Sequence, residues 1–300
     1  MCSSQISVME IHKKEPTVVQ YDSLTNMRPQ KYNDDYTYHH LIGQTLMYCG
    51  DPYSLISRTK GLNIGDYFEV TGVLPDVPAK GWYERFSFRN TETGEEGEEG
   101  DIFRDNYNFK WLVVGHFEKL KSLYIGKEFV LLDTSESYDK QDNLINAETD
   151  AIVKGVKYGS IWKCIDVQAR LRRKEDRMDS DYRSPIVLIF QNDNYGKYYC
   201  YTERKLGRQY NSLVCGRFML KSEYDKRKLD LIKKYGQYNA KLILAGTVRV
   251  GMSKAMCKEA WGEPTKINTT TNKYGQSEQW VYGSDSYLYF ENGKLTDIQN

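Results

Sequence analysis

Residues 279–298 read QWVYGSDSYLYFENGKLTDI, and this stretch decides the fold of the last quarter of the chain. Three runs in it, 279–282, 287–290 and 294–298, alternate apolar or aromatic residues with polar ones, as half-buried strands do. Turn-forming residues separate the runs, and Asn292-Gly293 is among the strongest short hairpin signals. The stretch therefore predicts a three-stranded antiparallel meander.

The residues before the meander carry helical patterns. Three segments are predicted, each followed by a glycine that can end a helix: 218–235 before Gly236, 237–245 before Gly246, and 253–261 before Gly262. Ser253 is a suitable N-cap for the last of them. Together these elements predict a small α+β module over residues 218–300, with two helices packed on the meander in the order α-α-β-β-β.

A set of residues in this module also carries a family resemblance: Gly251, Met252, Trp261, Gly262, Pro264, Asn292 and Gly293. With the strand-like runs around them, these residues resemble the pattern of the SmpA/OmlA (BamE-like) family over about residues 220–300. The resemblance implies structural roles for them and a layout similar to the β-lactamase-inhibitor-protein (BLIP-like) fold.

The best-known members of this family are bacterial outer-membrane lipoproteins that support outer-membrane protein assembly by binding proteins and lipid. This chain differs from them because it has a large N-terminal region and no visible secretory signal. The resemblance implies no catalytic residue, and fold carries over between proteins better than function does.

The region before the module is rich in short β-type runs, and one cycle of runs occurs twice. The matched runs are Ile42–Tyr48 with Ile125–Leu131, Gly65–Val70 with Gly159–Cys164, Phe86–Asn90 with Leu188–Asn192, and Leu112–Phe117 with Leu213–Phe218. The spacing between partners drifts, as loop insertions would make it drift. We predict a flexible arm over 1–37 and two tandem repeats, 38–122 and 123–217, each an SH3-like or OB-like β-barrel. A chance match between two β-rich stretches is the alternative.

Two segments between the β-type runs are strongly charged. Thr93–Asp101 is acidic and rich in glycine, which predicts a solvated, mobile loop. Arg170–Arg177 is basic but interrupted by acids, so a solvated face is expected there, with a phosphate-binding patch as the alternative.

The overall charge argues against a nucleic-acid partner. The formal net charge of +1 gives no field that would concentrate nucleic acid or anionic lipid. No window is apolar enough to span a membrane and no secretory signal is visible, so a cytoplasmic protein is expected from the sequence as written. A lipid could be attached at Cys2 if a signal preceded it, and the protein would then belong to the cell envelope.

Residues with catalytic potential are few. The chain has four histidines, of which the adjacent pair His39-His40 would point to opposite faces of a strand, and His116 lies among apolar neighbours. The five later cysteines lack CxxC spacing and are expected to be buried thiols. We therefore expect no metal or cofactor site and no catalytic residue. The alternative is a hydrolase that uses His39 or His116 with a cysteine or a carboxylate.

The aromatic residues of the meander are the best candidates for binding a partner. Trp280, Tyr282, Tyr287 and Tyr289 alternate along neighbouring strands, so one set must cover the helices while the other faces outward. Core packing is favoured for Trp280 and Tyr289, and both roles stay open for Tyr282 and Tyr287. The hypothesis is a non-catalytic protein-binding or scaffolding protein. A nucleic-acid-binding protein is the first alternative.

Overall fold

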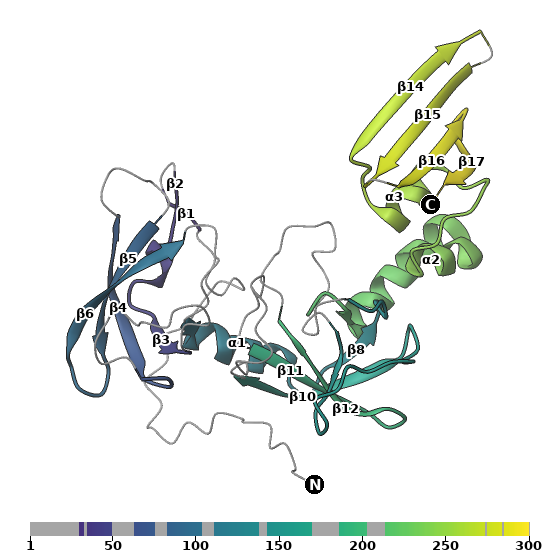
Figure 1. Cartoon of the computed structure of the whole chain (residues 1–300). Helices are drawn as coiled ribbons and strands as arrows, with labels where there is room; N and C mark the ends of the chain where they lie inside the picture. The colour runs from purple at the N-terminus through teal and green to yellow at the C-terminus, as the bar shows by residue number, and fades with distance from the viewer. Residues whose placement is uncertain are drawn as a thin grey trace. The chain divides into compact units, whose positions relative to one another are not determined.

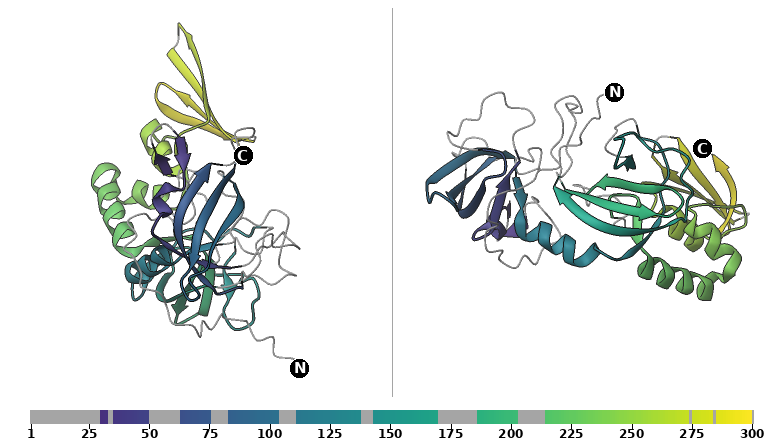
Figure 2. Two further views of the ribbon diagram at one scale, coloured as in Figure 1. Left: turned by 90° about the vertical axis from the view of Figure 1, so that its left-hand side faces the viewer. Right: turned by 90° about the horizontal axis from the view of Figure 1, so that it is seen from below.

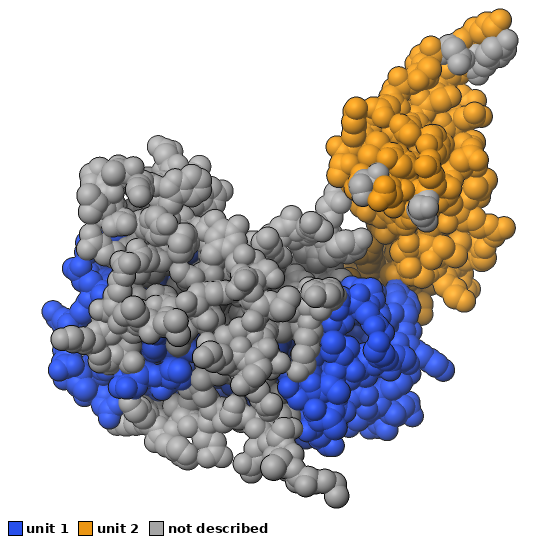
Figure 3. Space-filling view, in the orientation of Figure 1, with its two compact units in different colours: residues 1–206, 213–218 blue, residues 207–212, 219–300 orange. Residues whose placement is uncertain are grey.

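The computed structural model describes residues 30–32, 35–49, 63–75, 83–103, 111–137, 143–169, 186–202, 214–273, 275–283 and 285–299. Over these residues the chain is mainly β, as the sequence predicts, with several antiparallel sheets and three α-helices (Figures 1 and 2). It divides into two compact units, one of residues 1–206 with 213–218 and the other of 207–212 with 219–300 (Figure 3).

The described residues begin with a short hairpin. It pairs β1 (Gln30–Tyr32) with β2 (Asp35–Thr37), so the end of the predicted flexible arm is in fact β-structure. The 3₁₀ turn η1 (His39–Leu41) follows, and the two adjacent histidines therefore lie in a helical turn and not on a strand.

The first large sheet has five strands in the order β6-β5-β4-β3-β7. The strands are β3 (Thr45–Tyr48), β4 (Tyr67–Pro75), β5 (Tyr83–Asn90), β6 (Glu96–Phe103) and β7 (Trp111–Val113). Its core contains three mutually packed rings, Phe68, Phe88 and Trp111, whose centroids lie 5.0–5.8 Å apart. Helix α1 (Val114–Tyr124) starts directly after β7.

The second large sheet has six strands in the order β13-β8-β10-β11-β12-β9. The strands are β8 (Glu128–Leu131), β9 (Ile145–Asn146), β10 (Ile161–Ala169), β11 (Ile186–Asn192), β12 (Gly196–Tyr201) and β13 (Phe218–Leu220). Helix α2 (Lys221–Leu244) starts directly after β13, as α1 does after β7.

Apart from the added β9, the two sheets have the same strand order, and the register of their central strands agrees. Leu46 pairs with Phe68 in the first sheet, and Phe129 pairs with Trp162 at the same place in the second. The next strand pair carries a bulge at the same point, directly after Val70 in β4 and after Cys164 in β10. We call two residues at the same place in the two sheets counterparts.

The turn after β5 and the turn after β11 are also built alike. The Asn90 side chain accepts hydrogen bonds from the backbone N–H groups of Glu92 and Thr93, and Asn192 accepts from Asn194 and Tyr195. Four positions after each asparagine stands a glycine with positive φ, Gly94 at 75° and Gly196 at 90°. A side chain at either glycine would strain the turn.

Three expectations for this region are wrong. None of the sheets closes into a barrel within the described residues. The last predicted pair of runs is not equivalent, because 114–117 is helical whereas 214–217 is a turn before β13. The acidic segment is not a loop but largely strand β6, in which Gly97 leaves room for the Phe88 ring.

The terminal unit contains α2, α3 (Lys254–Trp261) and a four-stranded sheet in the order β14-β15-β16-β17. The strands are β14 (Lys266–Asn272), β15 (Gly275–Tyr282), β16 (Ser286–Glu291) and β17 (Lys294–Gln299). The meander is confirmed, but with β14 as an additional strand. Gly236 interrupts α2 with φ 78° and ψ 161°, as its predicted role as a helix end requires. The hairpin of β14 and β15 extends beyond α3 (Figure 1).

Candidate binding surface

The inner face of the terminal sheet packs against the helices. Trp280, Leu288 and Phe290 form its centre and are at most 1% exposed, and the buried Met252 and Cys257 pack with them. The expectation that Trp280 fills the core is confirmed. This residue is therefore not available to a partner.

Tyr282 lies on the same inner face, two positions after Trp280. Its ring packs edge-on against Trp261 at 5.2 Å, and its hydroxyl donates to the Gly262 carbonyl at 3.0 Å. Burial raises the pKa of Tyr282 well above its usual range. We therefore assign Tyr282 a structural role at the end of α3.

Tyr287 and Tyr289 lie on the opposite, outer face, so the structure does not bring the four predicted aromatic residues together. Tyr289 belongs to a chain of side-chain hydrogen bonds that crosses all four strands. Asn268 Nδ2 donates to Gln279 Oε1 at 2.9 Å, Gln279 Nε2 donates to the Tyr289 hydroxyl at 3.0 Å, and that hydroxyl donates to Gln299 Oε1 at 2.9 Å. The prediction that Tyr289 is a core residue is wrong.

A hollow of about 690 Å³ lies over this outer face. It is lined by the four residues of the hydrogen-bonded chain and by hydroxyl and carboxylate side chains, including Thr270, Asp297 and Glu291. The chain fixes the amides and the phenol in one arrangement. The outer face therefore offers preorganised hydrogen-bonding groups next to aromatic surface.

The residues on which the predicted family resemblance depends lie at turns and at the ends of elements. Gly251 has φ 93° and donates its N–H to the Leu295 carbonyl at 2.8 Å, while the buried Met252 accepts from the Leu295 N–H at 2.9 Å. This segment therefore pairs with the start of β17.

The other motif residues mark the ends of elements. Trp261 Nε1 donates to the Gly246 carbonyl at 2.8 Å, and Gly262 ends α3 with φ 81°. Asn292 and Gly293 form the predicted β16–β17 turn with positive φ, and Pro264 lies half-buried between α3 and β14.

One ion pair lies between α3 and the sheet. Lys254 Nζ is 2.7 Å from Glu278 Oε1, and Trp280 Nε1 donates to the other carboxylate oxygen at 2.8 Å. These two contacts lower the pKa of Glu278. The charged form of Glu278 thus stabilises the packing of α3 on the sheet.

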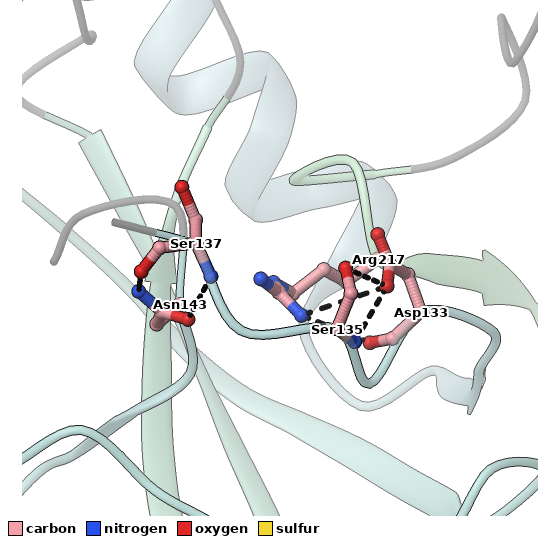
Figure 4. Close-up of polar contacts among 5 residues, drawn as sticks. All are labelled: Asp133, Ser135, Ser137, Asn143 and Arg217. Carbon is pink, nitrogen blue, oxygen red and sulfur yellow. Dashed lines mark hydrogen bonds and ion pairs between the residues drawn. The ribbon is translucent and has the colours of Figure 1, made fainter. Parts of the chain in front are cut away.

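A second polar cluster, not singled out in the sequence, surrounds Arg217 in the turn before β13 (Figure 4). The Arg217 side chain is 6% exposed and donates to the Asp133 carbonyl at 3.1 Å, with the Asp133 carboxylate 3.9 Å away. On its other side Asn143 exchanges two hydrogen bonds with the Ser137 backbone. A cavity of about 30 Å³ between these groups has room for a water or two.

The candidate catalytic groups lie in the described residues, where the cysteines and His116 are buried. The five cysteines there are buried free thiols, as expected. Burial raises the pKa of Cys49, Cys164 and Cys257 to about 12, which disfavours the nucleophilic thiolate. His116 is buried in α1. No cluster of three or more His, Cys, Asp or Glu residues that could hold a metal ion occurs in the described ranges.

Two predicted features lie outside the described residues, the lipid-attachment candidate Cys2 and the basic segment 170–177. Where the chain is described, no helix is both long and apolar enough to cross a membrane. Comparison with protein-family models, curated proteins and solved structures finds no match to this chain.

Proposed function

We propose that this chain is a non-catalytic binding protein that recognises another protein with the outer face of its terminal sheet. The observation that supports this most is the hydrogen-bonded chain Asn268–Gln279–Tyr289–Gln299 below a hollow of about 690 Å³. These side chains are already ordered, so binding would lose less conformational entropy than an unpaired polar surface would.

The chemistry of the outer face favours a polypeptide partner. Tyrosine supplies large contact area with few rotatable bonds, and amides can both donate and accept hydrogen bonds from a peptide backbone. The opposite face is occupied by α3 and its core contacts. A partner would therefore contact Tyr287 and Tyr289, and not Trp280 or Tyr282.

The proposal also covers how the chain is organised into modules. The shared strand order, register and turns favour the two large sheets as copies of one β-module, joined by α1. The terminal unit would then be a BamE-like module with an added strand. Attachment to the cell envelope is part of the proposal only if a lipid is carried at Cys2.

The test is capture of partner proteins by the immobilised full chain from an extract of the cells that make it. Tyr287→Ala should weaken capture of the specific partner by about tenfold or more, as loss of an interface tyrosine does. Tyr289→Phe keeps the ring but removes the hydroxyl from the hydrogen-bonded chain, so it should also weaken capture.

Leu229→Ala is the matched control, because Leu229 is an apolar side chain that is 67% exposed on α2. Equal capture by all four proteins would contradict the proposal. Binding to nucleic acid that falls steeply with salt would favour the first alternative instead.

A further inference from the structure

Three edge strands of the described sheets, β6, β9 and β17, are protected against pairing with another strand. In the first sheet, the outermost strand β6 carries the exposed Glu96 and Glu98. In the second, β9 at one margin is only two residues long, which leaves little edge to pair with. Charges on an edge strand and very short edge strands are two ways in which proteins avoid unwanted pairing.

The third protected edge belongs to the terminal sheet. There β17 is partly covered, because Gly251 and Met252 exchange backbone hydrogen bonds with Leu295, and Ser253 bridges to Lys294. Another strand cannot extend the sheet at that end of β17.

The edge strand β14 has no such protection. It is seven residues long, its side chains from Lys266 to Thr271 are exposed, and no other described segment pairs with its outer side. Residues 267–271 read INTTT, with neither charge, proline nor bulge. Ile267 lies on the inner face of the sheet and is 45% exposed.

The register shows which backbone groups point outward. Asn272 and Gly275 flank a two-residue turn, so they form a hydrogen-bonded pair, and such pairs alternate along the hairpin. The N–H and C=O groups of Ile267, Thr269 and Thr271 therefore point away from β15. In agreement, the carbonyl of Gln276, which is opposite Thr271, accepts from Asn292 on the far side of β15.

We propose that β14 pairs antiparallel with β14 of a second copy of this chain, with the two Thr269 residues opposite each other on the two-fold axis. This register matches the outward backbone groups, since Ile267 faces Thr271 of the second copy and Thr269 faces itself. The one charged residue of the strand, Lys266, faces the uncharged Asn272. Like charges therefore do not oppose each other.

The pairing also stops at two copies. The other margin of each terminal sheet is β17, which the Gly251–Ser253 segment covers in part. The result is one eight-stranded sheet with isologous contacts and not an open-ended fibre. This inference concerns the edge of the sheet and does not depend on the proposed role of its outer face.

The test measures the mass of the full chain by light scattering at increasing concentration. The wild type is expected to rise from the monomer mass of 35.0 kDa to twice that value. Thr269→Lys and Thr269→Glu each place like charges opposite one another, and each should raise the dissociation constant by roughly tenfold or more. An equimolar mixture of the two variants should restore the dimer. Thr269→Val, neutral and β-branched, should leave it unchanged.

Three results would overturn the proposal. The first is a wild type that stays monomeric at every concentration. The second is a wild-type dimer that neither charged variant weakens, since such a dimer would use another surface. The third is failure of the mixed variants to associate when circular dichroism shows both to be folded, because the pairing would then not be centred on Thr269.

Discussion

Ser87 and Glu98 lie opposite each other on a polar part of one face of the first sheet, whereas their counterparts in the second sheet, Ile189 and Tyr199, are each 3% exposed. The other face is alike in both sheets, with Phe68, Phe88 and Trp111 in one and Trp162, Phe190 and Phe218 in the other. At this place the first sheet carries polar residues, whereas its counterpart carries buried apolar ones.

The cover on the second sheet comes from the longer connection between β8 and β10. This connection contains β9, which adds Ile145 to a buried cluster with Val187, Ile189 and Tyr199. Asp150 in the same connection accepts a hydrogen bond from the Tyr199 hydroxyl. Arg217 binds the start of the connection at Asp133. The same strand framework therefore tolerates polar or buried apolar residues at these positions of its second face.

The largest expected effect tests the shared face. Phe88→Ala and Phe190→Ala remove counterpart rings, and each should lower the free energy of unfolding of its own sheet by about 3–5 kcal/mol. Hydrogen exchange followed by mass spectrometry can separate peptides of β5 from peptides of β11. A large loss of stability in one variant with almost none in the other would contradict the equivalence of the two cores.

The next effect tests the face that differs. Ile189→Ala should destabilise the second sheet by about 2–5 kcal/mol, because it opens a cavity in a buried cluster. Ser87→Ala at the counterpart position should change stability by no more than about 0.5 kcal/mol, since Ser87 lies on the polar face. Chemical denaturation of both variants checks this, and similar losses of stability would show that Ser87 is packed as tightly as Ile189.

A smaller effect is expected at Arg217, which holds the connection to the turn before β13. Arg217→Met keeps much of the side-chain volume but removes the hydrogen bond to the Asp133 carbonyl, which should cost about 1–2 kcal/mol. Faster hydrogen exchange should be confined to peptides of residues 132–137 and 143–160. An equal increase of hydrogen exchange in peptides of the first sheet would contradict this role of Arg217.

The smallest effect extends the comparison to the terminal sheet and depends on pH. The pKa of Glu278 is lowered in the folded protein by Lys254 and Trp280, so its contribution to stability is present above the pKa of the unfolded chain. This contribution to stability is lost as the pH falls through the lowered pKa that Glu278 has in the folded protein. Glu278→Gln should therefore flatten the decline of the melting temperature between roughly pH 5 and 3. An identical decline in both proteins would exclude this role.

Local signals in the sequence were sufficient to predict much of the secondary structure of the terminal unit. The Asn292-Gly293 turn, the break at Gly236 and the Ser253 N-cap each depend on the conformation of a few neighbouring residues. Ser253 indeed accepts a hydrogen bond from the Met256 N–H at 3.3 Å. Such features can be predicted because no distant partner decides them.

The missed features depend on partners far apart in the sequence. Strand β14 is rich in threonine and asparagine and lacks an apolar alternation, so only its pairing with β15 defines it. The outer-face chain of hydrogen bonds requires the register of four strands. Arg217 meets Asp133 across 84 positions, and no local pattern indicates that contact.

The break in α2 has a consequence for how the terminal unit forms its helical core. Leu231 lies before Gly236, and Ala240 and Ile243 lie after it, yet all three belong to one buried cluster. In a straight helix, Leu231 and Ile243 would be about 18 Å apart along the axis, too far for a common cluster. The positive φ of Gly236 thus bends the helix, and residues on both sides of the bend pack into the same apolar cluster.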